Sequence, residues 1–342
     1  MCSNLKNICL FLLMNVPLFL FSQEKIHAQK IWDKGGHNAF TDLIRFQDKF
    51  YCTFREGENH VHGEDGKIRV LVSDDGDVWT SLALIEKSGY DLRDSKLSIT
   101  PKGRLMLLMG GSKYENKTLL GRLTHVSFFD PNRKQFSAPQ AVRIDEKIKS
   151  NWDWLWRVTW HKGKGYGVVY RKENNLGSQA FLVSTKDGVR YDLVYALDVF
   201  GLPGEASVAF KGDEMYMVIR RDYKEVNGLL GISKMPYSTW TWKDLGVHLG
   251  GPQIMFSSEG KLLLGSRSFH REGENNHDKT SIFMINKSFE IEKEIVLHSG
   301  GDNSYPGMVE HNGVLWVSYY SSHEGKSNVY MAKIPLNDLG LK

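Results

Sequence analysis

Six copies of one short unit run along the chain, each a strand, a tight turn that often contains glycine, and a second strand dense in apolar residues. Successive copies start roughly 45 to 65 residues apart, at Ala39, Asp91, Trp154, Pro203, Gly250 and Ser304. Further strand-like runs fall between them, and no sustained helical stripe is present. Repeats of this length are typical of four-stranded propeller blades, which bury both faces against their neighbours. The sequence therefore predicts an all-β, six-bladed β-propeller, or a five-bladed one if one copy is degenerate.

The first residues are typical of an export signal rather than of the fold. Lys6 precedes an apolar stretch over residues 8–21, and small residues follow that stretch. The stretch is interrupted twice and is shorter than the ~20 apolar residues that a membrane-spanning helix needs. We therefore expect a signal peptide over residues 1–22, with cleavage after Ala28 as the alternative. Residues 23–342 are then a single domain of a secreted or periplasmic protein without a membrane span.

Charge and composition narrow the class of partner. Basic and acidic residues alternate along the chain, and removal of Lys6 with the signal lowers the formal net charge from +4 to +3. Because no basic run of five or more residues occurs, we expect no nucleic-acid partner. Aromatic residues make up 12% of the chain and include nine tryptophans, a supply that suits stacking against sugar rings. We expect a glycan partner, no cofactor and no metal site. Cys52 is the only cysteine outside the signal, so no internal disulfide can form. The sequence leaves the oligomeric state open.

Two turns share the pattern hydroxyl, acid, glycine and aromatic. One runs from Ser73 to Trp79 and the other from Thr185 to Tyr191. In both, the hydroxyl and the carboxylate can accept hydrogen bonds from the turn backbone, and the glycine can take positive φ. Each turn resembles the Asp-box turn of sialidase-like propellers, in a shorter form. We expect these turns to serve folding rather than chemistry.

Two sets of equivalent positions are expected to converge at one end of the propeller axis. Near the start of each first strand lie Asp42, Asp94, Arg157, Glu205, Pro252 and Tyr305. Five residues into each second strand lie Arg55, Gly110, Arg171, Arg220, Arg267 and Tyr320. Clustered guanidinium groups repel one another unless an anion lies between them, and arginine binds carboxylates in a bidentate way. The arginines therefore favour an acidic sugar, with pairing to neighbouring acids such as Glu56 or Asp222 as the alternative.

Over nearly all of its mature length the chain resembles the sialidase superfamily. The segment GEASVAFKGDEMYMVIRR, which begins at Gly204, is similar to the sialidase segment in which a glutamate precedes a hairpin and an arginine follows it. The resemblance implies that Glu205 activates a tyrosine and that Arg220 binds a carboxylate. The segment NSYPGMVEHNGVLWVSYY implies Tyr305 as the nucleophile. The loop before the first Asp-box turn implies Asp65 as acid and base, with His60 and His62 nearby as competitors.

One segment departs from this family pattern. Sialidases begin with Arg-Ile-Pro, whose arginine opens a triad of carboxylate-binding arginines, whereas the matching strand here reads Ala-Phe-Thr-Asp from Ala39. Arg55 or Arg93 could supply the missing charge, and Arg267, Arg271 and Lys279 compete for the third place. The side chains that we expect to bind substrate are Arg55, Arg93, Arg157, Arg220, Arg267, Asp42, Asp94 and His60.

The sequence supports three functions. The first is an exo-acting, sialidase-like glycoside hydrolase, since a phenol needs a neighbouring carboxylate to become a nucleophile and a separate acid must protonate the leaving oxygen. The second is an inverting, furanosidase-type propeller that uses the carboxylates of Asp42, Asp94 and Glu205. The third is a propeller that binds glycans without cleaving them, because one fold hosts many functions.

Overall fold

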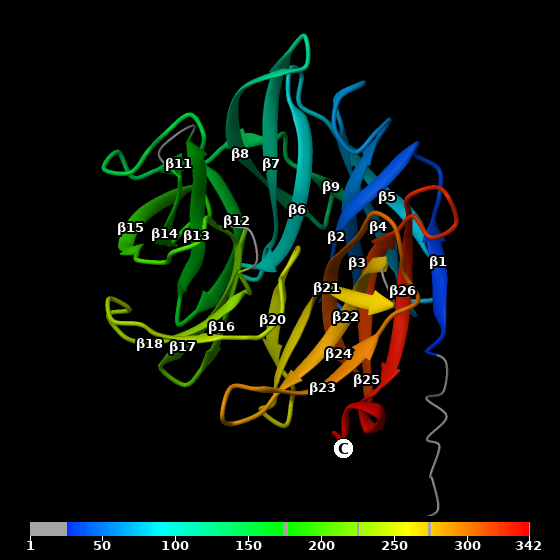
Figure 1. Ribbon diagram of the computed structural model, residues 1–342. Helices are drawn as coiled ribbons and strands as arrows, with labels where there is room; N and C mark the ends of the chain where they lie inside the picture. The colour runs from blue at the N-terminus through cyan, green and yellow to red at the C-terminus, as the bar shows by residue number, and fades with distance from the viewer. Residues whose placement is uncertain (1–25, 174–176, 224–225, 273–274, 342) are drawn as a thin grey trace, which may run out of the picture.

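The computed structural model describes residues 26–173, 177–223, 226–272 and 275–341. The signal peptide expected over residues 1–22 lies outside these ranges. Six sheets are arranged around a common axis, so the prediction of an all-β, six-bladed propeller is confirmed (Figure 1). None of the described residues forms a helix long and apolar enough to cross a membrane.

The first three blades follow one another along the chain, each with its first strand innermost. Blade I contains β2 (His37–Phe46), β3 (Lys49–Gly57), β4 (Lys67–Ser73) and β5 (Thr80–Ile85). Blade II contains β6 (Asp91–Ile99), β7 (Leu105–Glu115), β8 (Thr118–Asp130), β9 (Gln135–Phe136) and β10 (Gln140–Ala141). Blade III contains β12 (Trp154–His161), β13 (Lys164–Glu173), β14 (Gly177–Thr185) and β15 (Arg190–Leu197), with β11 (Arg143–Ile144) at its outer edge.

The last three blades repeat the arrangement and close the ring. Blade IV contains β16 (Pro203–Lys211), β17 (Glu214–Arg221), β18 (Leu229–Lys234) and β19 (Thr241–Asp244). Blade V contains β20 (Gln253–Phe256), β21 (Leu262–Glu272), β22 (Asn275–Ile285) and β23 (Ile291–Val296). Blade VI contains β24 (Asn303–His311), β25 (Val314–Ser321), β26 (Asn328–Pro335) and, as its outermost strand, β1 (Ala28–Trp32) from the other end of the chain. A short 3₁₀ helix, Leu336–Leu339, follows β26.

Six apolar clusters fill the six spaces between neighbouring blades. In the cluster between blades I and II, for example, Ile68 and Val70 pack with Leu105 and Leu107, and all four are fully buried. This two-sided burial explains why the second strand of each repeat is almost continuously apolar. Burial of apolar area, the dominant favourable term in folding, is therefore spread evenly around the ring.

Five of the six innermost strands share a β-bulge at the same level. In β2, β6, β12, β16 and β24, two consecutive residues have no partner on the adjacent strand. The bulges begin at Phe40, Asp94, Trp156, Gly204 and Tyr305. Phe40, Asp94 and Tyr305 have positive φ values of 65°, 53° and 53°, which are uncommon for residues with a side chain. A bulge bends its strand and redirects a side chain, so five bulges at one level direct several side chains to one end of the axis.

The bulges show that some residues expected at the same level of the inner strands lie at different levels. The sequence pattern put Asp42 at the level of Asp94, but the first paired residue after the bulge is Asp42 in β2 and Lys96 in β6. The residue of β2 at the level of Asp94 is Phe40. The first strands do converge at one end of the axis, as expected. The alignment of Asp42 with Asp94 was wrong, because a bulge adds residues to a strand and the pattern of apolar positions does not reveal it.

The two turns with the shared pattern adopt the expected geometry. Gly76 N donates to Ser73 Oγ at 2.8 Å, and Asp75 Oδ1 accepts from the amides of residues 77 and 78. Gly76 has a φ of 81°, and the turn at Gly188 forms the same bonds with a φ of 78°. The turn also packs against the next blade, because a Cβ built on Gly76 would lie 2.4 Å from Trp316 of blade VI. These turns therefore help to hold neighbouring blades together.

We predict that Gly76→Ala destabilises the protein by about 2 to 4 kcal/mol, because the methyl group meets Trp316 and the φ is unfavourable. Gly163→Ala is the matched control, since Gly163 also has a φ of 81° but its Cβ would meet nothing within 4 Å. The control should cost about 1 kcal/mol, the backbone contribution alone. Urea unfolding of both variants measures the difference, and equal losses would contradict the packing role of the turn.

Candidate active site

A cavity of about 280 Å³ lies at the end of the axis where the innermost strands begin and the second strands end. Blades II, III, IV and VI contribute its walls. The charged side chains that line it are Arg93, Asp94, Arg122, Lys172, Glu205, Arg220 and Asp222. The aromatic side chains that line it are Tyr114, Trp154, Tyr170 and Tyr305. Its aromatic walls and converging charged groups are typical of a small-molecule binding site.

Tyr305 and Glu205 form the centre of the cavity. The Tyr305 hydroxyl donates to Glu205 Oε1 at 2.5 Å, although the two residues are 100 positions apart in the chain. Both side chains are more than nine-tenths buried. Burial, with the neighbouring carboxylates of Glu205 and Asp94, raises the pKa of Tyr305 well above its ordinary value. The phenol is therefore neutral and hydrogen-bonded to a proton acceptor.

Glu205 is held in its ionised form by three partners. Burial acts to raise its pKa, but the charge of Arg220 and the hydrogen bonds from Tyr305 and Gly251 outweigh burial, so the pKa lies below its ordinary value. Arg220 Nη1 lies 3.0 Å from Glu205 Oε2, and the Gly251 amide donates to the same oxygen at 2.7 Å. Gly251 has a φ of 63°, and a Cβ there would lie 2.5 Å from the Tyr305 ring. A glycine is therefore required for the amide and the tyrosine to meet at Glu205.

Asp94 is a second carboxyl group in the same cavity, and its pKa is shifted in the opposite direction to that of Glu205. Burial raises the pKa of Asp94 to about 6, although the charge of buried Lys96 acts in the opposite direction. Its Oδ1 is buried and has no hydrogen-bond partner among the described residues. A carboxyl group whose pKa is near neutral can hold a proton and release it, whereas Glu205 remains ionised.

Asp65, the acid expected from the sequence, lines a neighbouring cavity of about 200 Å³ instead. Tyr114 is common to the walls of both cavities. Asp65 is exposed on the connection between β3 and β4, and partial burial with the charge of Asp91 raises its pKa. The structure thus separates the two acid candidates: Asp94 lies in the cavity of Tyr305, and Asp65 lies in the adjacent one.

Two of the four arginines in the expected set, Arg55 and Arg171, are buried and paired away from the central cavity. Arg55 is fully buried; its Nε lies 2.8 Å from Asp91 and its Nη1 donates to the Asn59 carbonyl at 2.7 Å. Arg171 lies 3.3 Å from Asp153 and also donates to a backbone carbonyl. Neither side chain lines the central cavity, so the alternative of local pairing describes both.

Asp42 and Arg157 pair with each other below the cavity. The two nitrogens of Arg157 donate to the two oxygens of Asp42 at 2.9 and 3.1 Å, and the Leu97 amide donates to Asp42 at 2.7 Å. Asp42 is fully buried, and Arg157 lines a different cavity of about 480 Å³ along the later parts of the inner strands. The bidentate pair joins blade I to blade III across the axis.

Three further expected arginines lie in or beside the cavity. Arg220 and Arg93 line it; Arg220 pairs with Glu205 and with Asp222 at 2.7 Å, and Arg93 pairs with Asp91. Arg267 does not line it, and its Nε donates to the Asn303 carbonyl at 2.8 Å. The structure therefore brings Tyr305, Glu205 and Arg220 together as the sequence predicted.

Two cations in the cavity wall were missed by sequence reasoning. The Arg122 guanidinium lies 5.5 Å from the centre of the Trp154 ring, and Lys172 is exposed on β13 of blade III. Neither is within ion-pair distance of an acidic group among the described side chains. Lys172 lies near the end of β13, the second strand of blade III, whereas Arg122 lies in β8, the third strand of blade II, so the second-strand pattern pointed only to the position of Lys172.

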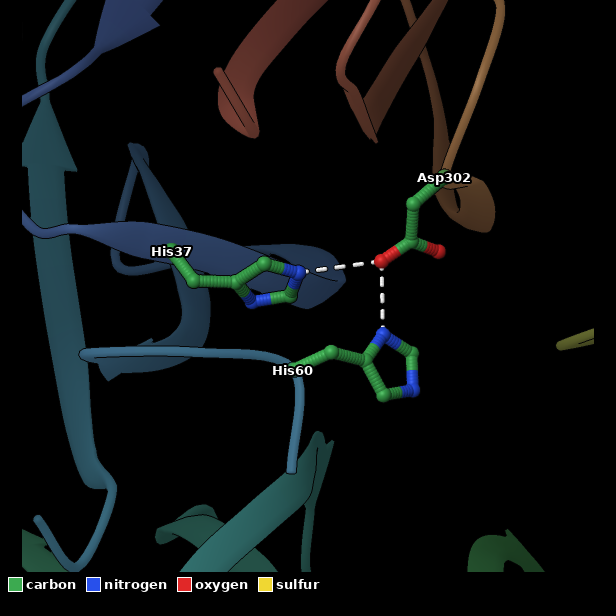
Figure 2. Close-up of side chains that lie close together, drawn as sticks. All are labelled: His37, His60 and Asp302. Atoms are coloured by element: carbon green, nitrogen blue, oxygen red, sulfur yellow. Dashed lines mark hydrogen bonds and ion pairs between the residues drawn. The ribbon is translucent and has the colours of Figure 1, made fainter. Parts of the chain in front are cut away.

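A cluster of possible metal ligands was also missed, since no metal site was expected. His37 and His60 both contact the Oδ2 atom of Asp302, at 2.9 and 2.6 Å (Figure 2). The donor atoms of all three lie within 4.8 Å of one another. His60, expected to bind substrate, thus lies in this cluster at the cavity rim, where its backbone carbonyl accepts from Arg93. Asp302 is 265 positions from His37 and 242 positions from His60, so no local spacing of residues indicates this cluster.

Solved structures share this fold. A protein of unknown function from Dyadobacter fermentans DSM 18053 superposes with a TM-score of 0.76 and 18% identity, over 90% of this chain and 98% of that one. Trypanosoma rangeli sialidase in complex with the inhibitor DANA superposes with a TM-score of 0.66 and 12% identity, over 90% of this chain and 56% of that one. The chain thus spans a little over half the length of that sialidase. No protein-family model and no curated protein matches the sequence. The fold is that of a sialidase-like β-propeller.

We predict that Asp94 makes stability depend on pH. Between about pH 4 and pH 6 the folded protein keeps a proton on Asp94 that the unfolded chain releases, so its contribution to stability falls as pH rises through this window. Asp94→Asn cannot titrate and should become progressively more stable than the unaltered protein over the same window. Urea unfolding across pH measures this difference.

The matched control is Asp192→Asn, which removes an exposed carboxyl group from β15 and corrects for net charge. If the Asp94→Asn curve runs parallel to that of the control, Asp94 does not have the raised pKa that its burial implies.

Proposed function

We propose that the protein is an exo-acting glycoside hydrolase of the sialidase type that removes a terminal acidic sugar from an exported or cell-surface glycan. The observation that carries this proposal is the hydrogen bond of 2.5 Å between the buried Tyr305 hydroxyl and Glu205. A carboxylate that accepts the proton of a neutral phenol prepares its oxygen for attack on an anomeric carbon. The sialidase-like fold supports the proposal without defining it, since fold alone does not determine function.

In this reaction Tyr305 forms a covalent bond to the anomeric carbon, and Glu205 takes the phenolic proton. Arg220 compensates the charge of Glu205 and leaves it ionised before the proton arrives. A phenol also avoids the repulsion that a carboxylate nucleophile would meet from an acidic sugar. A water molecule that loses a proton to the acid residue then displaces Tyr305 from the anomeric carbon, the phenolate takes its proton back from Glu205, and the configuration of the anomeric carbon is retained.

Asp94 is proposed as the acid that protonates the leaving oxygen. It lines the cavity with Tyr305, and its pKa of about 6 allows it to carry the proton at mildly acidic pH. Asp65, which the family resemblance implies, is the competing candidate from the neighbouring cavity.

The charge distribution supports an acidic substrate. Arg220 and Arg93 are already paired with carboxylates, so the cations left to bind an anionic group of the sugar are Arg122 and Lys172. Trp154 and Tyr170 line the same cavity and provide aromatic surface for the sugar ring.

The furanosidase-type mechanism is less well supported. It needs Asp42 as a general base, yet both oxygens of Asp42 accept hydrogen bonds from Arg157 and the side chain is fully buried. A water molecule has no access to a carboxylate that is held in this way, so inversion by Asp42 is not proposed.

Release of free sugar from a panel of sialylated, Kdo-containing, uronic-acid and arabinofuranoside substrates tests the proposal. We expect release from at least one acidic substrate and none from the arabinofuranoside. Glycan binding without release from any member would contradict the proposal and favour a propeller that only binds.

We predict that Tyr305→Phe lowers kcat on the cleaved substrate by roughly 10³-fold or more, because it removes the nucleophilic oxygen and leaves the ring in place. Tyr319→Phe is the matched control, since its buried hydroxyl donates to the His298 carbonyl away from the cavity. Steady-state kinetics of both variants measure the effect. Full activity in Tyr305→Phe would exclude the tyrosine mechanism.

The acid is identified by its dependence on the leaving group. Asp94→Asn should slow cleavage of a natural glycoside by about 10²- to 10⁴-fold but should slow a 4-nitrophenyl glycoside of the same sugar far less, because nitrophenolate leaves without a proton. Asp65→Asn should affect the two substrates equally. The opposite pattern would transfer the role to Asp65.

A further inference from the structure

We propose that His37, His60 and Asp302 form a binding site for a divalent transition-metal ion of the zinc type. Figure 2 shows the two imidazole rings directing one nitrogen each at the same carboxylate oxygen from different sides. Two imidazole nitrogens and one carboxylate are a ligand set that binds Zn²⁺ and leaves a fourth position open. This site is independent of the proposed hydrolysis.

The three ligands come from the two blades that close the ring. His37 begins β2, His60 lies on the connection between β3 and β4, and Asp302 immediately precedes β24. An ion bound here would therefore link blade I directly to blade VI. His60 also contacts Phe40, with ring centres 5.2 Å apart, and Phe40 lies 4.9 Å from the Tyr305 ring. The proposed ion is thus one aromatic ring away from the central cavity.

A second layer of hydrogen bonds holds the carboxylate in position. The fully buried Tyr320 donates its hydroxyl proton to Asp302 Oδ1 at 2.8 Å, and the Asp302 amide donates to Ser322 Oγ at 2.8 Å. With Oδ1 occupied in this way, Oδ2 is directed at the two histidines. Supporting bonds of this kind orient metal ligands and raise affinity.

The ligand spacing requires the two imidazole nitrogens to move, since the three donor atoms lie within 4.8 Å of one another and a tetrahedral ion separates its ligands by about 3.3 Å. Bonds of about 2.0 to 2.1 Å to a tetrahedral ion separate the donor atoms by about 3.3 Å, compared with 2.9 and 2.6 Å in the hydrogen-bonded cluster. His60 can supply this movement, because its side chain is 49% exposed on a loop. An ion would take the place of the two protons that the imidazoles now donate to Asp302.

The other nitrogen of His37 limits the affinity. Its Nδ1 is buried without a hydrogen-bond partner among the described residues, and a metal-bound imidazole would carry a proton there. Missing support at one ligand typically lowers metal affinity by about 10- to 100-fold. We therefore expect the site to bind zinc about 10- to 100-fold more weakly than a site in which every ligand is supported.

The test uses tag-free protein that has been treated with a chelator and then titrated with ZnCl₂ in a calorimeter. We expect one equivalent of Zn²⁺ to bind and, at a tenfold excess over the dissociation constant, the melting temperature to rise by about 3 °C. Titration with Co²⁺ should produce the visible absorption of a tetrahedral complex. Absence of saturable binding at one equivalent, or of the Co²⁺ absorption, would overturn the proposal.

Two variants of the same loop separate this site from adventitious binding. His60→Ala should weaken Zn²⁺ binding at least tenfold, and circular dichroism should show that this exposed substitution leaves the fold intact. His62→Ala is the matched control, because His62 is also exposed but faces Tyr114, with ring centres 5.5 Å apart. Equal weakening in both variants would refute the assignment of the ion to His37, His60 and Asp302.

Discussion

Closure of the ring is the constraint on which the other interactions depend. Each blade buries two faces, and the faces of blades I and VI are covered only when these blades meet. The meeting is fixed by the antiparallel pairing of β1 with β26, in which Gln29 lies opposite Met331. Without that pairing, β26 would present an unpaired edge and the apolar cluster between blades VI and I would open to water.

Because the ring is closed, the repeated bulges can place side chains from several blades at one end of the axis. Because the inner strands are held at one level, a bulge in each of five of them brings residues from distant parts of the chain to one end of the axis. Asp94 and Tyr305 take positive φ at these bulges, and Gly251 does so beside them. Backbone strain of this kind persists only where the surrounding structure enforces it, and it is often found at functional sites. The same strands that build the core therefore build the cavity.

Sequence reasoning predicted the fold well because its signals are local and repeated. Apolar second strands and the turns at Gly76 and Gly188 each depend on a few neighbouring residues. It also predicted the meeting of Glu205 with Tyr305, through the resemblance to sialidase segments.

The sequence could not show which residues from distant parts of the chain meet across the propeller axis. The partner of Arg157 is Asp42, 115 positions away, and the partner of His60 is Asp302, 242 positions away. The bulges, which shift Asp42 out of the level of Asp94, leave no trace in the pattern of apolar residues. The acid candidate Asp94 was recognised as a carboxylate near the axis, but its raised pKa follows from burial that only the structure reveals.

The pairing of β1 with β26 also has a consequence for the order in which the molecule can assemble. Ala28 pairs with Ala332, so this contact encloses almost the whole chain. Bringing the ends of such a long segment together costs about 5 kcal/mol of chain entropy if the intervening residues are still disordered. Blades that form first shorten the effective loop and lower that cost, because their neighbours contact one another along the sequence. We therefore expect β1 to pair with β26 only after the blades between them have formed.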